Sequence, residues 1–348
     1  MVRKIGLIAF DITRRCTLNC LHCYNHSGEN NEWKELSDEK LDRILRDLAS
    51  VEPDSFCICG GEPLLRKERA FSFVEEGKQK YPSMDINMVT NGELVTREVA
   101  ERMVTSNLSS IQFSMDGASS KTHDWLRNKQ GVFQKVIQAI KYVDEERARY
   151  NSDLLISIAF CPTKENIHEI DTAIKLCEEL HVELFRVQPL MLIGRAEKNL
   201  NEKLLNRKEY SELSRKLHKR KIDHAISSRI MVDWIDPLDH IMVDDSKEIS
   251  FIQVNASGDL LLSPYIPIAV GNLKNHSIHE YLERDYFELW DHKLFQLMKD
   301  SIKSAEQMNL LQLRNELPSV GKGVIAFDAL EDDCIAKMDA FYEKLIRE

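Results

Sequence analysis

Short apolar runs alternate along this chain with longer segments in which apolar residues recur every three or four positions. The short runs are typical of buried strands, and the wider spacing is typical of helices with one buried face. Six strand–helix pairs of this kind occupy the first 190 residues. The runs expected to form strands are residues 4–12, 55–59, 85–89, 110–115, 154–160 and 182–187.

The segment after the first predicted strand contains a clear helix start. Ser37 is a suitable N-cap, and Leu36 and Leu41 flank it as a hydrophobic staple. The apolar stripe of this helix is Leu41, Ile44, Leu45 and Leu48. Further helices are expected around Phe71 and Val74, over residues 98–106, along Val132, Val136, Ile140 and Val143, and over residues 167–180.

Strand–helix repeats predict an α/β fold with parallel strands joined by right-handed crossovers. Such strands form either an open barrel or a doubly wound sheet. Barrel enzymes build their sites at the C-terminal ends of the strands. The polar and cysteine-containing segments of this chain that follow its predicted strands are therefore candidates for a functional site.

The pattern changes after about residue 200. A charged helical stretch over residues 201–221 precedes a predicted β-hairpin at about 250–262, with Ser257-Gly-Asp259 at its turn. An amphipathic helix is expected over residues 278–298, and a break at Gly321-Lys-Gly323 precedes a final helix. We therefore expect a core domain over residues 1–220 and a C-terminal α+β extension over residues 221–348.

The composition is that of an ordinary soluble globular protein, with 43% hydrophobic and 30% charged residues in a chain of 348. The formal net charge of −10, without a long basic run, argues against a dedicated nucleic-acid binder. No apolar run approaches the roughly 20 residues that a membrane span requires. The N-terminus does not resemble a signal peptide, so we expect a cytoplasmic protein without a membrane partner.

The strongest chemical signal is Cys16-Thr-Leu-Asn-Cys20-Leu-His-Cys23, just after the first predicted strand. Three thiolates can bind three irons of a [4Fe–4S] cluster and leave the fourth iron open to a ligand. A structural zinc site is an alternative, with His22 or His26 as the fourth ligand. A disulfide framework is disfavoured, because three clustered cysteines are odd in number and no secretion signal precedes them.

This spacing resembles the cluster motif of the radical S-adenosylmethionine (radical SAM) family, in which an aromatic residue stands at the position of His22. The resemblance implies one [4Fe–4S] cluster held by Cys16, Cys20 and Cys23, with S-adenosylmethionine (SAM) bound at the open iron. It implies that the core is a partial (β/α)6 barrel. It also implies a flavodoxin- or ferredoxin-type reductant as a partner.

The resemblance assigns SAM-binding roles to residues at the predicted strand ends. Cys59-Gly-Gly-Glu-Pro63 is similar to the segment that holds the methionyl amine, so Gly60, Gly61, Glu62 and Pro63 are expected there. Thr90 and Asn91, at the next strand end, are expected to face SAM. From the residues alone, both segments could instead be ordinary turns.

Three further contacts are implied at the following strand ends. Ser114 and Asp116 are expected to hydrogen-bond the ribose or the methionyl group. Arg127 lies in a His-Asp-x-x-Arg stretch and is expected to clamp the methionyl carboxylate, a role suited to a planar guanidinium. A solvent-exposed arginine is the alternative for Arg127.

The stretch from Gln188 to Ala196 ends in Gly-Arg-Ala and resembles a peptide-modifying branch of the family. Gln188 is expected at the SAM site, and the backbone around Ile193 is expected to pack on adenine. A strand that simply runs into a loop is equally compatible with the pattern.

The C-terminal hairpin and the helix after it are similar to the SPASM or twitch extension of the family. That extension carries cysteines for auxiliary clusters, whereas this chain has Leu262-Ser-Pro-Tyr265 at the matching place and only Cys334 beyond residue 200. One thiol cannot supply the four cysteine ligands of an ordinary cluster. We therefore expect an extension that keeps the scaffold and lacks an auxiliary cluster.

Cysteines outside the cluster motif are more often packing residues than catalytic ones. Cys161, at the end of the fifth strand, is the first candidate for a hydrogen-atom donor, and Cys334 is a weaker one. Cys57, Cys59 and Cys177 are expected to be packing residues.

The sequence thus predicts a radical SAM enzyme that cleaves SAM to a 5′-deoxyadenosyl radical and removes a hydrogen atom from an unactivated carbon. The expected substrate is a ribosomally made peptide, modified by epimerisation, cross-linking or a related reaction. A small metabolite such as a sugar or nucleoside is the alternative substrate, and a non-catalytic iron–sulfur electron carrier is the alternative function.

Overall fold

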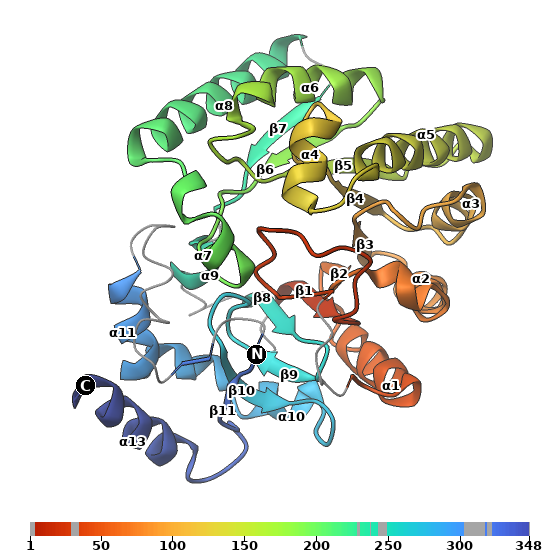
Figure 1. Cartoon of the computed structure of the whole chain (residues 1–348). Coiled ribbons are helices and arrows are strands. Elements are labelled where there is room, and N and C mark those ends of the chain that lie inside the picture. The colour runs from red at the N-terminus through yellow and green to blue at the C-terminus, as the bar shows by residue number, and fades with distance from the viewer. Residues whose placement is uncertain are drawn as a thin grey trace.

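The computed structural model describes residues 4–28, 35–227, 230–236, 238–242, 249–302, 317–318 and 322–347. In this part of the chain, one sheet has the strand order β11-β10-β9-β8-β1-β2-β3-β4-β5-β6-β7. Neighbouring strands from β8 through β1 to β7 are parallel, β9 is antiparallel to both β8 and β10, and β11 is parallel to β10. Figure 1 shows the strands of this sheet arranged along an arc.

Strands β1 to β6 of the arc lie where the apolar runs predict them. They are β1 (Ile5–Asp11), β2 (Ser55–Cys59), β3 (Asp85–Thr90), β4 (Ser110–Ser114), β5 (Leu155–Phe160) and β6 (Leu184–Val187). Strand β7 (Met231–Trp234) has no counterpart in the prediction, because its short, mixed sequence lacks an apolar run. The C-terminal strands are β8 (Ile249–Val254), β9 (Asp259–Leu261), β10 (Ile268–Asn272) and β11 (Ile325–Ala326).

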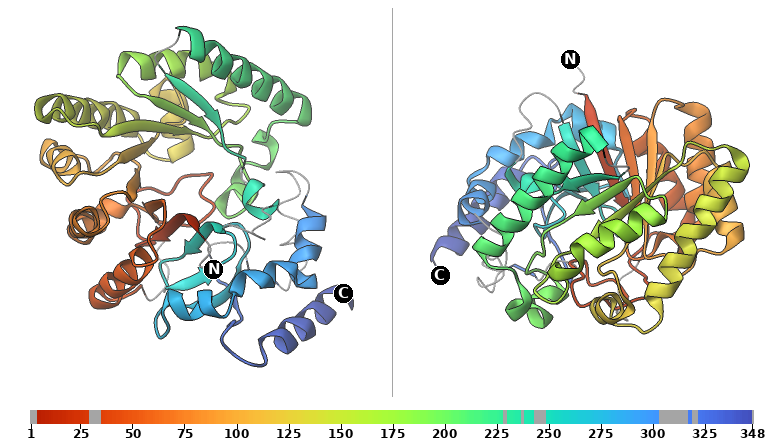
Figure 2. Two further views of the ribbon diagram at one scale, coloured as in Figure 1. Left: turned by 180° about the vertical axis from the view of Figure 1, so that it is seen from behind. Right: turned by 90° about the horizontal axis from the view of Figure 1, so that it is seen from above.

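Helices cover the convex side of the arc (Figure 1 and Figure 2, right). They are α1 (Asp38–Ala49), α2 (Lys67–Lys80), α3 (Arg97–Thr105), α5 (Val132–Tyr150), α6 (Ile170–Glu179) and α8 (Arg207–Ser227). Helix α4 (Ser120–Arg127) lies instead against the loop after β1, where the carbonyl of Leu126 accepts a hydrogen bond from the N–H of Leu21. The short α7 (Arg195–Asn199) and α9 (Asp239–Met242) lie near the opening of the arc. The C-terminal helices are α10 (Ile278–Glu283), α11 (Lys293–Ser301) and α13 (Cys334–Arg347).

Local sequence explains where two of these helices begin or end. The Ser37 side chain accepts a hydrogen bond from the backbone N–H of Lys40, and the predicted apolar stripe of α1 is buried. The helix predicted over residues 278–298 is interrupted instead. Asp285 adopts a left-handed conformation and His292 is extended, so α10, a 3-10 turn (Tyr286–Asp291) and α11 replace one long helix.

The sheet continues across the predicted domain boundary at residue 220. Strand β8, from the C-terminal part, pairs in parallel with β1, and Ile252 lies opposite Ile8 in the register. Both of these side chains are fully buried. The predicted hairpin is formed by β8 and β9, and Gly258 adopts a positive φ of 80° at its turn. A break was also predicted at Gly321-Lys-Gly323, and its first residue, Gly321, lies outside the described residues.

The concave side of the arc carries small and polar side chains rather than a filled core. On β2, Phe56 and Ile58 are buried toward the helices, whereas Ser55, Cys57 and Cys59 are only partly buried and line cavities. Closed barrels fill this space with layers of bulky side chains. The residues of the concave side therefore leave room for ligands.

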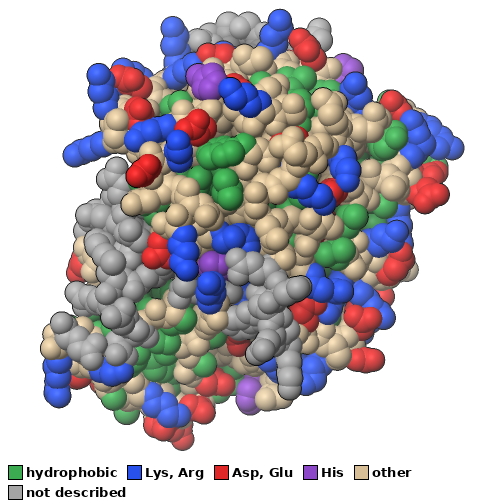
Figure 3. Space-filling model, viewed as in Figure 1, with side chains coloured by type: hydrophobic (Ala, Val, Ile, Leu, Met, Phe, Trp, Pro, Cys, Tyr) green, Lys and Arg blue, Asp and Glu red, His purple; other side chains and the backbone are tan. Residues whose placement is uncertain are grey.

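The molecular surface mixes both signs of charge. On the face shown in Figure 3, Lys and Arg side chains lie beside Asp and Glu side chains. Among the described residues, none of the helices combines the length and apolarity needed to cross a bilayer.

Candidate active site

A cavity of about 300 Å³ lies at the C-terminal ends of the parallel strands. Each predicted strand end from β2 to β6 contributes to its wall, as the barrel rule anticipates. The predicted site residues that line it are Cys16, Cys20, Cys23, Gly60, Gly61, Thr90, Asn91, Ser114, Asp116, Arg127, Cys161 and Gln188. Glu62, Pro63, Ile193 and Cys334 are not among the residues that line it.

The three clustered cysteines lie on the loop after β1, and backbone hydrogen bonds fix this loop from two sides. The N–H of Leu21 donates to the carbonyl of Leu126 at 2.9 Å, and the N–H of Arg195 donates to the carbonyl of Cys23 at 2.9 Å. The Nε of Arg195 also donates to the carbonyl of Cys20 at 2.8 Å. Arg195 thus acts as an anchor of the cysteine loop, a role that sequence reasoning missed.

Gly60 and Gly61 allow the turn after β2 to touch the cysteine loop. The N–H of Gly61 donates to the carbonyl of Thr13 at 2.8 Å. A Cβ atom on Gly60 would lie 2.3 Å from the oxygen of Thr13, and one on Gly61 would lie 2.3 Å from the oxygen of Arg15. The glycines are therefore required by the approach of the protein's own backbone, in addition to any ligand.

Gly194 makes a third close approach to the same loop. Its φ is 62°, and a Cβ atom there would lie 2.3 Å from the oxygen of Tyr24. The Gly-Arg-Ala stretch therefore supports the cysteine loop from the side of β6. Ile193, just before it, is buried and lies outside the lining of the cavity.

Glu62 is fully buried and holds the strand ends together. Its carboxylate accepts hydrogen bonds from the hydroxyl of Thr90 (2.9 Å) and from the backbone N–H groups of Asn91 (2.9 Å) and Leu64 (3.1 Å). Burial raises the pKa of Glu62 to about 7, although these hydrogen bonds oppose the shift. The predicted contact of Glu62 with a methionyl amine stays a prediction, because this carboxylate faces protein groups in the structure.

Asn91 connects Glu62 to the cysteine loop. Its Nδ2 donates to the hydroxyl of Thr17 at 3.1 Å and lies 3.6 Å from the sulfur of Cys16. Burial raises the pKa of Cys16 to about 12. In the metal-free chain this side chain is therefore a neutral thiol at pH 7, and it must lose its proton to bind iron.

Arg127, at the end of α4, forms an ion pair with Asp116 at 2.6 Å. Its second nitrogen lies 3.7 Å from the sulfur of Cys20. Burial is the largest single influence and would raise the pKa of Asp116, but the charge of Arg127, together with the neighbouring histidines and the backbone N–H of Cys161, keeps the pKa below its usual value. Arg127 is thus a buried cation at the cavity wall rather than a solvent-exposed arginine.

Asp116 also positions Cys161. Its second carboxylate oxygen accepts a hydrogen bond from the backbone N–H of Cys161 at 2.9 Å. The Nδ2 of Asn166 donates to the carbonyls of both Asp116 (2.8 Å) and Cys161 (2.9 Å). Burial raises the pKa of the Cys161 thiol well above its usual value, so its S–H bond stays intact at pH 7.

His22, between the second and third cysteines, is partly buried beside this pair. Its Nε2 lies 3.7 Å from the carboxylate of Asp116. Burial lowers the pKa of His22 to about 4, against the opposing charge of Asp116. His22 is therefore a neutral imidazole at pH 7.

Tyr265 brings the C-terminal part of the chain to the cavity. Its hydroxyl accepts a hydrogen bond from the Nε2 of Gln188 at 3.1 Å, and its ring meets that of Tyr24 edge-on, with centroids 5.5 Å apart. Sequence reasoning noted this position only as a place without cysteine. Cys334 lies apart from the cavity on α13, where its sulfur is 3.9 Å from that of Met338.

Residues 10–177 match the family described as the radical SAM superfamily. The chain contains a radical SAM domain. An AdoMet-dependent heme synthase of Methanosarcina barkeri is 28% identical over 199 residues, which cover 57% of this chain and 54% of that protein. The PqqA peptide cyclase of Bradyrhizobium diazoefficiens is 23% identical over 231 residues, which cover 66% of this chain and 58% of that protein.

Two solved structures share the fold of this chain. Streptococcus suis SuiB bound to precursor peptide SuiA has a TM-score of 0.64 at 16% identity, over 85% of this chain and 67% of that chain. The anSMEcpe structure with bound AdoMet has a TM-score of 0.61 at 17% identity, over 99% of this chain and 98% of that chain. The chain spans about half the length of the first curated relatives that it matches.

Radical SAM enzymes bind a [4Fe–4S] cluster and SAM, and the residues present fit both groups. Three thiols face one cavity, and Arg127 supplies a buried cation for a carboxylate. In the described residues, no group of three or more His, Cys, Asp and Glu side chains lies close enough together to hold a single metal ion. The thiols of Cys16, Cys20 and Cys23 instead line the active-site cavity itself.

The close approach at Gly61 predicts a substitution that disturbs the cysteine loop. In Gly61→Ala, the new Cβ must displace the carbonyl of Arg15, so the loop shifts and most of the iron should be lost. Iron per chain after anaerobic reconstitution measures the effect. Gly131→Ala is the control: at its φ of 81° the substitution strains the backbone, but no atom lies within 4 Å of its Cβ position, so the cysteine loop is not displaced and iron should be retained. Full iron loading of Gly61→Ala would show that the loop tolerates the shift.

Proposed function

We propose that this chain is a radical SAM enzyme whose cluster is held by Cys16, Cys20 and Cys23. One observation supports this proposal above all. The three thiols and the buried Arg127–Asp116 ion pair line the same cavity at the C-terminal ends of the strands. When bound, the cluster supplies the electron that cleaves SAM, and the resulting 5′-deoxyadenosyl radical removes a hydrogen atom from the substrate.

The protein's own residues position and shield the reacting groups. Arg127 binds the methionyl carboxylate through its guanidinium, which requires that its bond to Asp116 be shared or exchanged. Asp116 then keeps its hydrogen bond to the backbone of Cys161. Ser114, Gln188 and Thr90 provide further polar contacts along the wall of the cavity.

For the substrate, we propose a ribosomally made peptide. PqqA peptide cyclase is among the relatives, and the fold of the whole chain is that of anSMEcpe, a protein also solved with a bound Cp18Cys peptide. A small metabolite is the second candidate, favoured by the heme synthases among the relatives. A non-catalytic electron carrier is the third candidate, and it should not cleave SAM.

We further propose that the C-terminal part binds no auxiliary cluster. It contributes Tyr265 and the hydrogen-bonded Gln188 to the cavity wall, and its sequence has a single cysteine. Without a second cluster to accept an electron, the substrate radical must be quenched, coupled, fragmented or oxidised by the first cluster. Epimerisation or bond formation then fits better than a simple two-electron oxidation.

The first test is the iron content and SAM cleavage of the anaerobically reconstituted chain. We expect about four irons per chain, the content of one [4Fe–4S] cluster, and release of 5′-deoxyadenosine under reducing conditions. Cys20→Ala should lose most of the iron and all SAM cleavage. Cys177→Ala is the matched control, because Cys177 is buried on α6, away from the cavity.

Each contrary result has a separate meaning. Full iron without 5′-deoxyadenosine would favour the electron carrier. About double the expected iron would show a second cluster and refute the proposal for the C-terminal part.

Arg127→Lys tests the binding of the methionyl carboxylate. Lysine keeps the charge but loses the two-pronged geometry of the guanidinium. Loss of one charge-assisted hydrogen bond costs about 1.5–3 kcal/mol, so the Kd for SAM should rise by roughly tenfold or more. Equilibrium binding of SAM to the reconstituted protein measures this. An unchanged Kd would limit Arg127 to its ion pair with Asp116.

Cys161→Ala tests whether a thiol returns a hydrogen atom to the substrate. The variant should still cleave SAM but yield unquenched or misrouted product. In deuterated water, the wild-type product should gain one solvent deuterium, because the S–H of Cys161 exchanges with solvent. Mass spectrometry of the product measures this gain. Full turnover by Cys161→Ala, with no deuterium in the wild-type product, would exclude Cys161 as the donor.

A further inference from the structure

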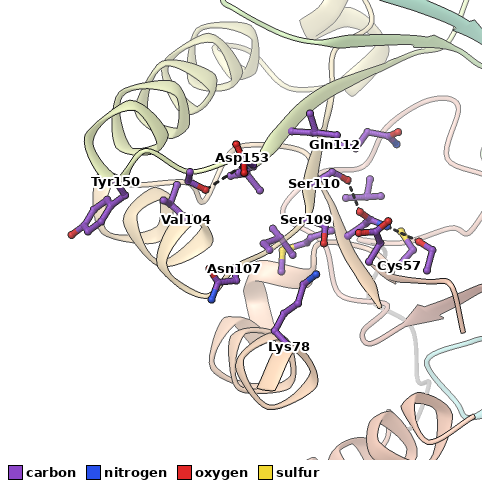
Figure 4. Close-up of a pocket in the computed structure, with 18 of the residues that line it drawn as sticks. Cys57, Lys78, Val104, Asn107, Ser109, Ser110, Gln112, Tyr150 and Asp153 are labelled. Carbon is purple, nitrogen blue, oxygen red and sulfur yellow. Dashed lines mark hydrogen bonds between the residues drawn. The ribbon is translucent and has the colours of Figure 1, made fainter. Parts of the chain in front are cut away.

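A second and larger cavity, of about 930 Å³, lies at the N-terminal ends of the strands. It shares Val89 and Gln112 with the lining of the active-site cavity, so the two spaces meet near the middle of β3 and β4. Figure 4 shows Ser110 and Gln112 on β4 and Cys57 on β2 around this space, together with Lys78 on α2 and Asn107 after α3. We refer to it as the lower cavity.

The polar side chains on the inner wall of the lower cavity are ordered by hydrogen bonds. The Oγ of Ser110 donates to Asn87 at 2.6 Å, and the Nδ2 of Asn87 donates to Ser55 at 2.7 Å. Hydroxyl and amide groups at these positions replace the bulky apolar side chains that fill the same layer of a closed barrel. A wall of this kind suits a polar ligand.

Two cations, Arg186 and Lys78, and two carboxylates, Asp85 and Asp153, line the lower cavity. Of the two cations, Arg186 lies on β6. Its NH1 donates to the Oε1 of Gln112 at 3.2 Å, and its Nε is shielded from solvent without a hydrogen-bond partner. Within the described residues, no carboxylate lies within ion-pair distance of Arg186. Asp233, opposite Arg186 in the register of β7, is paired with Lys221 at 2.9 Å.

The guanidinium of Arg186 is only partly buried, because it lies on the wall of an open cavity, and water supplies part of its hydration. Its shielded Nε has lost that hydration, and this loss is uncompensated unless a counter-charge or a hydrogen bond replaces it. One neutral amide at 3.2 Å is a weak replacement. By contrast, a carboxylate or phosphate oxygen would match the fork of donors on the guanidinium and neutralise its charge.

We propose that the lower cavity is a second binding site, in which Arg186 and Gln112 bind the oxyanion of a small polar ligand. The carboxylate or phosphate lies against Arg186, and the remainder of the ligand lies along Ser110, Asn87 and Ser55 toward the open end. Binding at Arg186 is separate from the radical reaction, and the lower cavity would bind its ligand even in a chain that does not cleave SAM.

The test is binding of inorganic phosphate and of succinate to the full-length reconstituted protein, by equilibrium dialysis. We expect saturable binding of at least one of these probes. Arg186→Met should weaken it by roughly tenfold to a hundredfold, because a charge-assisted pair is lost. Arg147→Met is the matched control: Arg147 is paired with Glu183 and Asp144 outside the lower cavity, so probe binding should be unchanged.

Thermal unfolding provides a second readout. Without a probe, Arg186→Met should melt at about the same temperature as the wild type or higher, since no ion pair is removed, whereas Arg147→Met should melt lower, since it loses its ion pairs with Glu183 and Asp144. If Arg186→Met melts markedly lower, Arg186 is a structural residue and the proposal fails. Arg186→Lys, which keeps the charge, should fold and retain part of the probe binding.

A last variant identifies which cavity holds the anion. Arg127→Lys alters the active-site cavity and should leave phosphate and succinate binding intact. Loss of probe binding in that variant would place the anion beside Arg127 and overturn the proposal. Wild-type protein that binds neither probe would overturn it as well.

Discussion

Contact between backbones, more than any side chain, fixes the place of the cysteine loop. The loop after β1 is held against the turn at Gly60 and Gly61 on one side and against Gly194 on another. At each of these points a side chain as small as alanine would overlap a carbonyl oxygen of the loop. Three thiols can therefore face one space only because three positions elsewhere in the chain have no Cβ atom.

A single buried carboxylate joins the two halves of the proposed chemistry. Asp116 pairs with Arg127 through one oxygen and accepts the N–H of Cys161 through the other. A carboxylate on SAM would compete with Asp116 for Arg127, and any shift of Asp116 would move the backbone of Cys161. Arg127, the proposed cation for SAM, lies on α4, and Cys161, the candidate hydrogen donor, follows β5. The shared contact with Asp116 couples the positions of these two residues.

The fold was largely predictable, because parallel strands buried against helices leave strong apolar runs in the sequence. That the three cysteines and the glycine turn line one cavity was predictable, because both follow parallel strands whose C-terminal ends meet at one edge. The roles of Glu62 and Arg195 were not, because a carboxylate or guanidinium in a motif can face a ligand or the protein's own backbone, and only coordinates distinguish the two. Strand β7 and the contact of Tyr265 were missed for another reason: both depend on long-range packing that leaves no local periodicity.

The pairing of β8 with β1 has a consequence for the order of events during synthesis. Strand β1 emerges from the ribosome early, but its second edge stays unpaired until residues 249–254 have been made. The cysteine loop begins at the end of β1 and also waits for Arg195 and Gly194. Metal delivery to a nascent chain would therefore meet an incomplete loop with its thiols unprotected. The topology delays cluster insertion until residues 249–254 have been made, and it sets a period in which oxidation of the thiols competes with maturation.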